Sequence, residues 1–120
     1  ETKIILSCDR QQISQSLTNI LKNAAESIIF DSNTIPNFLG KIKLKLVNKP
    51  NQICIYILDN GVGFSENLID RISEPYITTR EKGTGLGLSI ASKIMEDHNG
   101  ELLLRNTKNS GAEVTLVFNK

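Results

Sequence analysis

The sequence predicts an α+β fold, a two-layer α/β sandwich in which helices lie on one face of a mixed, mainly antiparallel sheet. Two observations lead to this prediction. Segments with a helical apolar period are interspersed with short segments whose apolar residues alternate or run continuously, as in strands. The strand-like segments come mostly in adjacent pairs joined by short turns, which favours antiparallel pairing. The resulting order is strand, helix, two strands, helices, two strands, which suits helices covering one face of a sheet.

The composition is that of one small domain, and residues 1–120 are expected to form a single unit. The net charge is +1, from 14 basic and 13 acidic residues, so no overall field favours nucleic acid or a membrane surface. The longest apolar run, Ile53–Leu58, is too short to cross a bilayer, and no signal peptide is visible. Cys8 and Cys54 are isolated, so two free, buried thiols in the reducing cytoplasm are expected. The chain starts without Met, and we expect it to be part of a longer protein.

The first third of the chain predicts a strand, a helix and a loop. Lys3–Ser7 is short, β-branched and apolar, as a strand would be. Asp9 is a suitable N-cap for the helix that follows, and Phe30–Gly40 lacks a period, which favours a loop. The helix has one apolar stripe and, nearly opposite, one polar stripe. The apolar stripe is Ile13, Leu17, Ile20, Leu21, Ala24 and Ile28, and the polar stripe is Gln12, Gln15, Asn19, Asn23 and Glu26.

A hairpin is predicted next. Lys41–Val47 alternates, with its aliphatic side chains expected to face inward and its lysines outward. Asn48–Asn51 has the composition of a turn. Ile53–Leu58 is apolar on both faces, which predicts a central strand covered on both sides. Its second cover would have to come from elsewhere, for example from a neighbouring part of the parent chain.

The second half predicts helices followed by a last hairpin. Ser65–Ile72 suits a short helical piece, and Leu86–His98 suits a longer helix that ends at Asn99-Gly100. Glu101–Arg105 and Ala112–Phe118 then read as two paired strands.

Glycines recur at Gly83, Gly85 and Gly87, directly before the longer helix. A loop that enters a helix N-terminus presents free N–H groups and the positive end of the dipole, which suits phosphate. Arg80 and Lys82 would add charge-assisted donors. The spacing fits neither the dinucleotide fingerprint nor the P-loop, so phosphate would be bound in a third way. A flexible linker or helix cap is the alternative.

Two further clusters carry potential chemistry. Asn19 and Asn23 lie four residues apart on the predicted helix, although asparagine is a poor helix former, which suggests another reason for their presence. The oxygen of an amide side chain is a suitable ligand for Mg²⁺. Asp59, Gly61 and Gly63 follow the buried strand, where a carboxylate accepts a bond from an exocyclic amine and glycines let a flat ring approach the backbone. The alternatives are a solvated helix face for the first cluster and an ordinary turn for the second.

Together these clusters resemble the catalytic, ATP-binding domain of bacterial two-component sensor histidine kinases. Leu17–Glu26 resembles the N box of this family, and Asp59–Phe64 its G1 box. Glu74–Arg80 resembles the F box, and Lys82–Ser89 the G2 box. The four motifs occur in the family's order, and their amino-acid sequences are most similar to those of the nitrogen-regulation branch.

The resemblance implies that ATP lies between the N-box helix and a lid at residues 77–83. Asp59 would bind the adenine amino group, Gly61 and Gly63 would form the adenine floor, and Asn23 would hold Mg²⁺. No catalytic residue is assigned; phosphate positioning falls to basic residues and to glycine backbone. The implied nucleotide-binding residues are Asn19, Asn23, Asp59, Gly61, Gly63, Arg80, Lys82, Gly83, Thr84, Gly85, Leu86, Gly87 and Leu88.

Asn19 stands where ATP-hydrolysing relatives such as gyrase carry a glutamate, and an amide cannot act as a general base on water. The resemblance therefore implies that ATP is spared for a histidine on a separate helical dimerisation and phosphoacceptor domain, with a response regulator downstream. His98 lacks the phosphoacceptor motif and is expected to be a protonatable helix cap. This chain alone should hold the ATP half of the reaction and be monomeric.

Two positions depart from the family pattern. Glu26 replaces a frequent lysine, and Glu113 replaces a frequent threonine, which puts one phosphate contact and one adenine contact in doubt. Two other functions stay open: a serine/threonine kinase of the related anti-sigma type, and a degenerate module that does not transfer phosphate.

Overall fold

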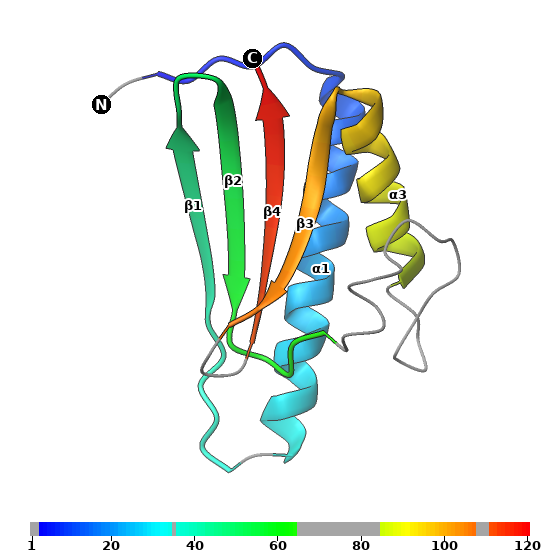
Figure 1. Cartoon of the computed structure of the whole chain (residues 1–120). Coiled ribbons are helices and arrows are strands. Elements are labelled where there is room, and N and C mark those ends of the chain that lie inside the picture. The colour runs from blue at the N-terminus through cyan, green and yellow to red at the C-terminus, as the bar shows by residue number, and fades with distance from the viewer. Residues whose placement is uncertain (1–2, 35, 65–84, 108–110) are drawn as a thin grey trace.

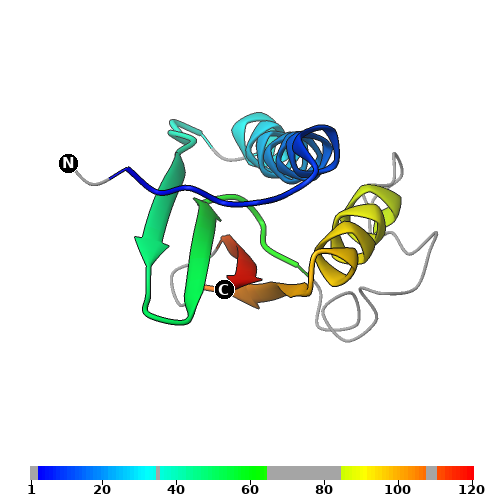
Figure 2. The same ribbon diagram turned by 90° about the horizontal axis from the view of Figure 1, so that it is seen from above.

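The computed structural model describes residues 3–34, 36–64, 85–107 and 111–120. Within them four strands form one sheet in the order β1-β2-β4-β3, and every neighbouring pair is antiparallel. Two helices lie on one face of this sheet, which confirms the predicted two-layer sandwich (Figures 1 and 2). The elements are α1 (Arg10–Thr34), β1 (Ile42–Asn48), β2 (Gln52–Asp59), α3 (Gly85–Asp97), β3 (Gly100–Asn106) and β4 (Ala112–Asn119).

Helix α1 begins as predicted and ends later than predicted. The Gln12 N–H donates to Asp9 Oδ1 at 3.1 Å, so Asp9 is the N-cap. The helix continues to Thr34, and the loop predicted from Phe30 onward was wrong for its first residues. Asp, Ser and Asn weaken a helix without stopping it, whereas Pro36 is the first residue that cannot continue one.

The strand predicted at Lys3–Ser7 is absent. This segment crosses the ends of the strands to reach α1 and has no strand partner among the described residues (Figure 1). Ile4 and Leu6 pack against the core, so their alternating pattern reflects an extended segment with one buried side. Cys8, at its end, is free and exposed, so the prediction of two buried thiols holds only for Cys54.

The first hairpin is confirmed, with one correction. Asn48 and Ile53 pair across a tight turn that the Lys49 N–H closes by donating to the Gln52 carbonyl at 2.8 Å. The predicted inward side chains of β1 are nevertheless 42–62% exposed. Helix α1 lies over β2, and β1 extends beyond it, so these side chains have no helix above them (Figure 2). They are Ile42, Leu44 and Leu46.

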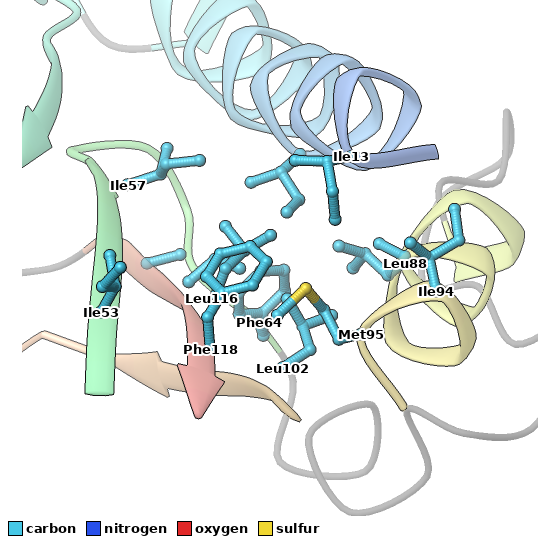
Figure 3. Close-up of a cluster of buried hydrophobic side chains, with 14 residues drawn as sticks. Ile13, Ile53, Ile57, Phe64, Leu88, Ile94, Met95, Leu102, Leu116 and Phe118 are labelled. Carbon is cyan, nitrogen blue, oxygen red and sulfur yellow. The ribbon is translucent and has the colours of Figure 1, made fainter. Parts of the chain in front are cut away.

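The core lies between the two helices and the strands β2, β4 and β3 (Figure 3). Ile13 and Ile20 of α1 are buried in it, whereas Leu21, also expected there, is 38% exposed. Neither helix is both long and apolar enough to cross a membrane, among the residues described. The core residues are Ile13, Ile20, Ile53, Ile57, Phe64, Leu88, Ala91, Ile94, Met95, Leu102, Ala112, Val114, Leu116 and Phe118.

Strand β2 is central, as predicted, but its second face has no second layer within the described residues. Cys54 is buried there, while Tyr56 and Leu58 are half-buried. They belong to the outer face of the sheet, where a hollow of about 470 Å³ includes Cys54, Tyr56, Leu103 and Val117. The double cover expected for β2 is therefore replaced, at Cys54, by neighbouring side chains of the sheet itself.

The second half follows the prediction closely. Helix α3 ends before Asn99, which adopts a left-handed conformation (φ 57°), and β3 and β4 form the last hairpin. The short helical piece expected at Ser65–Ile72 lies outside the described residues.

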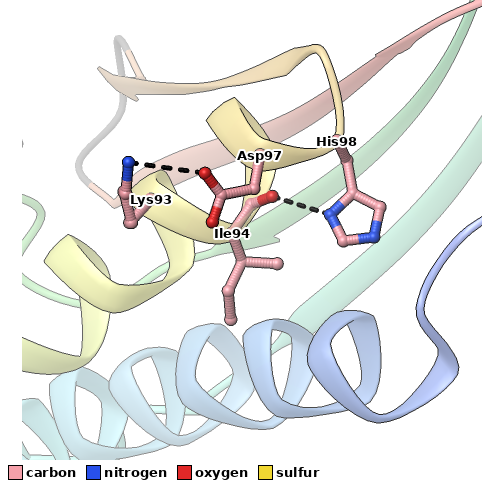
Figure 4. Close-up of polar contacts among 4 residues, drawn as sticks. All are labelled: Lys93, Ile94, Asp97 and His98. Carbon is pink, nitrogen blue, oxygen red and sulfur yellow. Dashed lines mark hydrogen bonds and ion pairs between the residues drawn. The ribbon is translucent and has the colours of Figure 1, made fainter.

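His98 joins the two helices. The backbone N–H of Asp9 donates to Nε2 at 3.0 Å, so this nitrogen is an acceptor and carries no proton. Nδ1 therefore carries the proton and donates to the Ile94 carbonyl at 2.8 Å (Figure 4). The expected role of His98 as a helix cap is confirmed by this bond to the Ile94 carbonyl. The nearby Lys93–Asp97 ion pair, at 3.4 Å, is exposed and adds little stability.

Candidate functional site

A polar stripe on α1 links the clusters that the sequence singled out. Asn19, Asn23 and Ser27 follow one another at steps of four residues, so they lie along one face over about 12 Å. Asn23 and Ser27 are 3% and 1% exposed, and Asn19 is half-buried. The asparagines were expected on a face nearly opposite the core, and the burial of Asn23 shows that this was wrong.

The C-terminal end of the stripe contacts the turn after β2. Asp59 is 8% exposed, and its Oδ1 accepts the Gly61 N–H at 2.8 Å. Ser27 Oγ accepts the Val62 N–H, also at 2.8 Å. A Cβ built on Gly61 would lie 2.0 Å from Ser27 Oγ, so α1 and the turn can approach this closely only because residue 61 is glycine. Ser27 was not predicted: a further step of four from Asn23 places it on the same helix face, but its role depends on the contact between α1 and the turn.

Asn60 fixes the same turn from the side of β1. Its Oδ1 accepts the Lys41 N–H and its Nδ2 donates to the Leu39 carbonyl, both at 2.8 Å. The start of the turn is thus hydrogen-bonded twice to the segment 39–41 that leads into β1, which holds Asp59 in place at the end of its strand.

The N-terminal end of the stripe contacts α3. Asn19 Nδ2 donates a long hydrogen bond, 3.4 Å, to the Gly87 carbonyl. The first turn of α3 contains no acidic residue, so its N–H groups and positive dipole end face no carboxylate from their own turn. The side chain of Leu88 is buried in the core, so only its backbone remains to meet a ligand.

The remaining predicted site residues fall into two groups. Gly85 and Leu86 form the start of α3. Arg80, Lys82, Gly83 and Thr84, with the expected lid at 77–83, lie outside the described residues.

Of the two departures from the family pattern, Glu26 is half-buried on α1. Glu113 lies on the outer face of the sheet, where its carboxylate pairs with Arg105 at 2.8 Å. The residue in register with Asp59 on β4 is Ala112. Glu113 therefore points away from the turn that holds Asp59.

A protein-only metal cage is absent from the described part of the chain, since no three His, Cys, Asp or Glu residues gather there. Magnesium commonly takes one or two protein oxygens and completes its shell with phosphates and water. The amide of Asn23, midway between the two ends of the stripe, fits that kind of site.

Comparison with known proteins identifies the family. Residues 8–120 match the model described as histidine kinase-, DNA gyrase B-, and HSP90-like ATPase. The chain belongs to this family. The catalytic domain of histidine kinase ThkA superimposes with a TM-score of 0.76 at 34% identity, covering 94% of this chain and 70% of that one. A mycobacterial sensor histidine kinase, MprB, shares the fold with a TM-score of 0.75 at 22% identity, over 92% and 72% of the two chains.

Several sequence relatives are named as nitrogen-regulation proteins or as putative NtrY-like sensor histidine kinases. The nitrogen regulation protein NtrY of Azorhizobium caulinodans is 45% identical over 114 residues, which are 92% of this chain and 14% of that protein. A putative NtrY-like sensor histidine kinase of Rickettsia prowazekii is 40% identical over 111 residues, 92% and 18% of the two. The chain thus spans less than a fifth of the length of either relative. Both the family and its nitrogen-regulation branch agree with the resemblance found in the sequence.

Proposed function

We propose that this domain binds Mg-ATP along the polar stripe of α1 and donates the γ-phosphoryl group to a histidine on a separate helical domain. The observation that carries the proposal is the continuity of the stripe. Asn19, Asn23 and Ser27 connect the turn after Asp59 with the start of α3. One ligand that is flat at one end and anionic at the other would meet suitable groups at both ends.

The turn after β2 suits the adenine end. A carboxylate accepts several hydrogen bonds, so Asp59 can hold Gly61 through Oδ1 and also receive a bond from an exocyclic amine. Because Asp59 sits in a buried setting, such a bond is stronger than it would be in water. Gly61 and Gly63 place bare backbone next to it, where a ring can lie flat.

The start of α3 suits the phosphates. Its first-turn N–H groups and dipole favour an anion. Asn23 would hold Mg²⁺, which when bound neutralises phosphate charge. Arg80, Lys82, Gly83 and Thr84 are proposed to add donors to the same phosphates.

Asn19 defines which reaction the site supports. Its amide bonds to the backbone of Gly87, next to the proposed phosphate position, and cannot remove a proton from water. The domain would therefore hold ATP without hydrolysing it quickly and await a better nucleophile. The names of the NtrY-like relatives, putative sensor histidine kinases, and of the structural neighbour ThkA, a histidine kinase, favour a histidine over a serine or threonine as that nucleophile.

The proposed setting follows from this chemistry. The acceptor histidine would be supplied by a helical dimerisation and phosphoacceptor domain of the parent chain, and a response regulator would receive the phosphoryl group next. The domain would work in the cytoplasm, where ATP is available, and this chain alone would be monomeric.

Calorimetric titration with ATP and ADP tests the proposal. We expect binding that weakens when Mg²⁺ is removed by a chelator. Asp59→Asn keeps an oxygen for the Gly61 N–H, so the fold persists, but the charged acceptor is lost and ATP affinity should fall about tenfold to a hundredfold. Asn23→Ala should remove the magnesium dependence. Unchanged affinity in both variants would contradict the site, and no binding by the wild type would favour a degenerate module.

The acceptor is tested separately by adding candidate helical domains with labelled ATP. An acid-labile phosphoryl product is expected for histidine, whereas an acid-stable one would favour the serine/threonine alternative.

A further inference from the structure

The end of the turn after β2 is held by a side chain that no motif includes. Asn106, the last residue of β3, accepts the Phe64 N–H at Oδ1 and donates from Nδ2 to the Phe64 carbonyl, each at 2.7 Å. Its amide therefore pairs with both backbone groups of one residue, as a neighbouring strand would. The side chain of Phe64 is 7% exposed in the core, so this point is fixed from two directions.

The register places this contact beside Asp59. Asp59 pairs with Ala112, and Ala112 pairs with Asn106, so the three residues form one row across β2, β4 and β3. Residues opposite each other in antiparallel strands share a face, and two strand spacings separate Asp59 from Asn106 by about 10 Å. The chain leaves the row at Asp59 and returns to it at Phe64, so Asn106 fixes the far end of the turn.

Gly63 is matched to this arrangement. It has a φ of +80°, and a Cβ there would lie 2.8 Å from Asn106 Oδ1 and 3.1 Å from the Gly111 carbonyl oxygen. The turn thus lies close to both Asn106 and the end of the β3–β4 hairpin, and the close fit leaves no room for a side chain at residue 63.

We infer that Asn106 is a positioning residue for the adenine end of the site. This inference rests on the proposed function. By holding Phe64, Asn106 keeps the Asp59–Gly63 turn in the shape that receives the ring before the ligand arrives, and binding of a preorganised site avoids the cost of ordering it. Because Asn106 itself is exposed and water competes for its bonds, its loss should weaken binding moderately, by about threefold to tenfold.

The test compares three variants by titration with ATP, ADP and GTP at a temperature where each is folded. Asn106→Ala removes both bonds, and Asn106→Asp keeps only the acceptor for the Phe64 N–H. Asn119→Ala is the matched control, since it also removes two side-chain amide hydrogen bonds, at the opposite end of the sheet. Asn119 Nδ2 donates to the Asn99 carbonyl at 2.7 Å, and Asn119 Oδ1 accepts from Gln52 Nε2 at 3.2 Å. Stability is measured alongside by urea unfolding.

We expect Asn106→Ala to weaken the binding of ATP and of ADP by the same factor. It should also lower the ratio of ATP affinity to GTP affinity, because the adenine end of the site is affected. Asn106→Asp should be intermediate and Asn119→Ala unchanged. A purely structural role would lower stability in Asn106→Ala and leave the ATP to GTP ratio as it was, which would overturn the inference.

The inference can fail while the proposed function stands. If Asp59→Asn weakens ATP binding and Asn106→Ala does not, Asn106 is not a positioning residue. If the wild type binds no nucleotide, both proposals are wrong. Should Asn106→Ala not fold, Asn106→Asp decides: a lower ratio of ATP to GTP affinity than in the wild type supports the inference, and an unchanged ratio overturns it. Hydrogen exchange of the wild type tests the contact itself, since a hydrogen-bonded Phe64 amide must be protected. A Phe64 amide that exchanges like a free amide refutes the contact.

Discussion

At the scale of single residues, the buried face of α1 is unusual in being half polar. Ser16, Asn23 and Ser27 are 0–3% exposed, alongside Ile13 and Ile20. A buried polar group is costly unless it is hydrogen-bonded, so each such residue needs a reason to be there. Ser27 has one in its bond to the Val62 N–H.

Ser16 has no such reason within the described residues, because its Oγ finds no hydrogen-bond partner there. We predict that Ser16→Ala raises the free energy of unfolding by about 1 kcal/mol, since an unsatisfied hydroxyl is removed and alanine favours helix. Ser14→Ala, on the exposed side of the same helix turn, is the control for helix propensity alone. Urea unfolding that finds Ser16→Ala no more stable than Ser14→Ala would show that the hydroxyl is satisfied.

At the scale of elements, two glycines beside α1 have different roles. Gly61 sits where a Cβ would overlap Ser27, with the Ser27 backbone carbon only 2.9 Å away. Gly87 sits where a Cβ would meet Asn19 at 3.6 Å, an ordinary contact. The first glycine is therefore required by packing between elements, whereas packing leaves room for a side chain at the second.

This difference gives a paired prediction. Gly61→Ala should lower the free energy of unfolding by about 2 kcal/mol, because α1 and the turn must move apart. Gly87→Ala should stay within about 1 kcal/mol of the wild type, because alanine suits a helix and has space. Thermal or urea unfolding of the two variants measures this directly. Equal destabilisation of both would mean that α1 and α3 are packed more tightly than the structure shows.

At the scale of the whole molecule, periodicity predicted most of the fold. The strands of both hairpins and the bodies of α1 and α3 follow from alternation, helical spacing and turn residues, which are local properties of the sequence. The prediction of a strand at Lys3–Ser7 was wrong, because an extended segment that packs one side against the core has the same alternation as a strand. The predicted burial of Leu44 and its neighbours on β1 was wrong, because their burial depends on how far a helix extends over the sheet.

The candidate site was predictable in part for the same reason. Asp59 and the glycines lie in short motifs, and these motifs pointed to the right family. Ser27 and Asn106 were missed because their roles depend on which elements come together. Ser27 acts because α1 passes over the turn, and Asn106 acts because three strands align it with Asp59. Neither the crossing nor the register is written in a local motif.

Amide shift mapping of the labelled domain during titration with Mg-ATP tests most directly whether one nucleotide spans the stripe. We expect shifts to gather at both ends of the α1 stripe, at Gly61 and Gly63 and at Gly87, while Leu103 and Val117 on the outer face of the sheet stay unchanged. Shifts centred on the outer face, or at one end of the stripe only, would contradict the claim that one nucleotide spans the stripe from the Asp59 turn to α3.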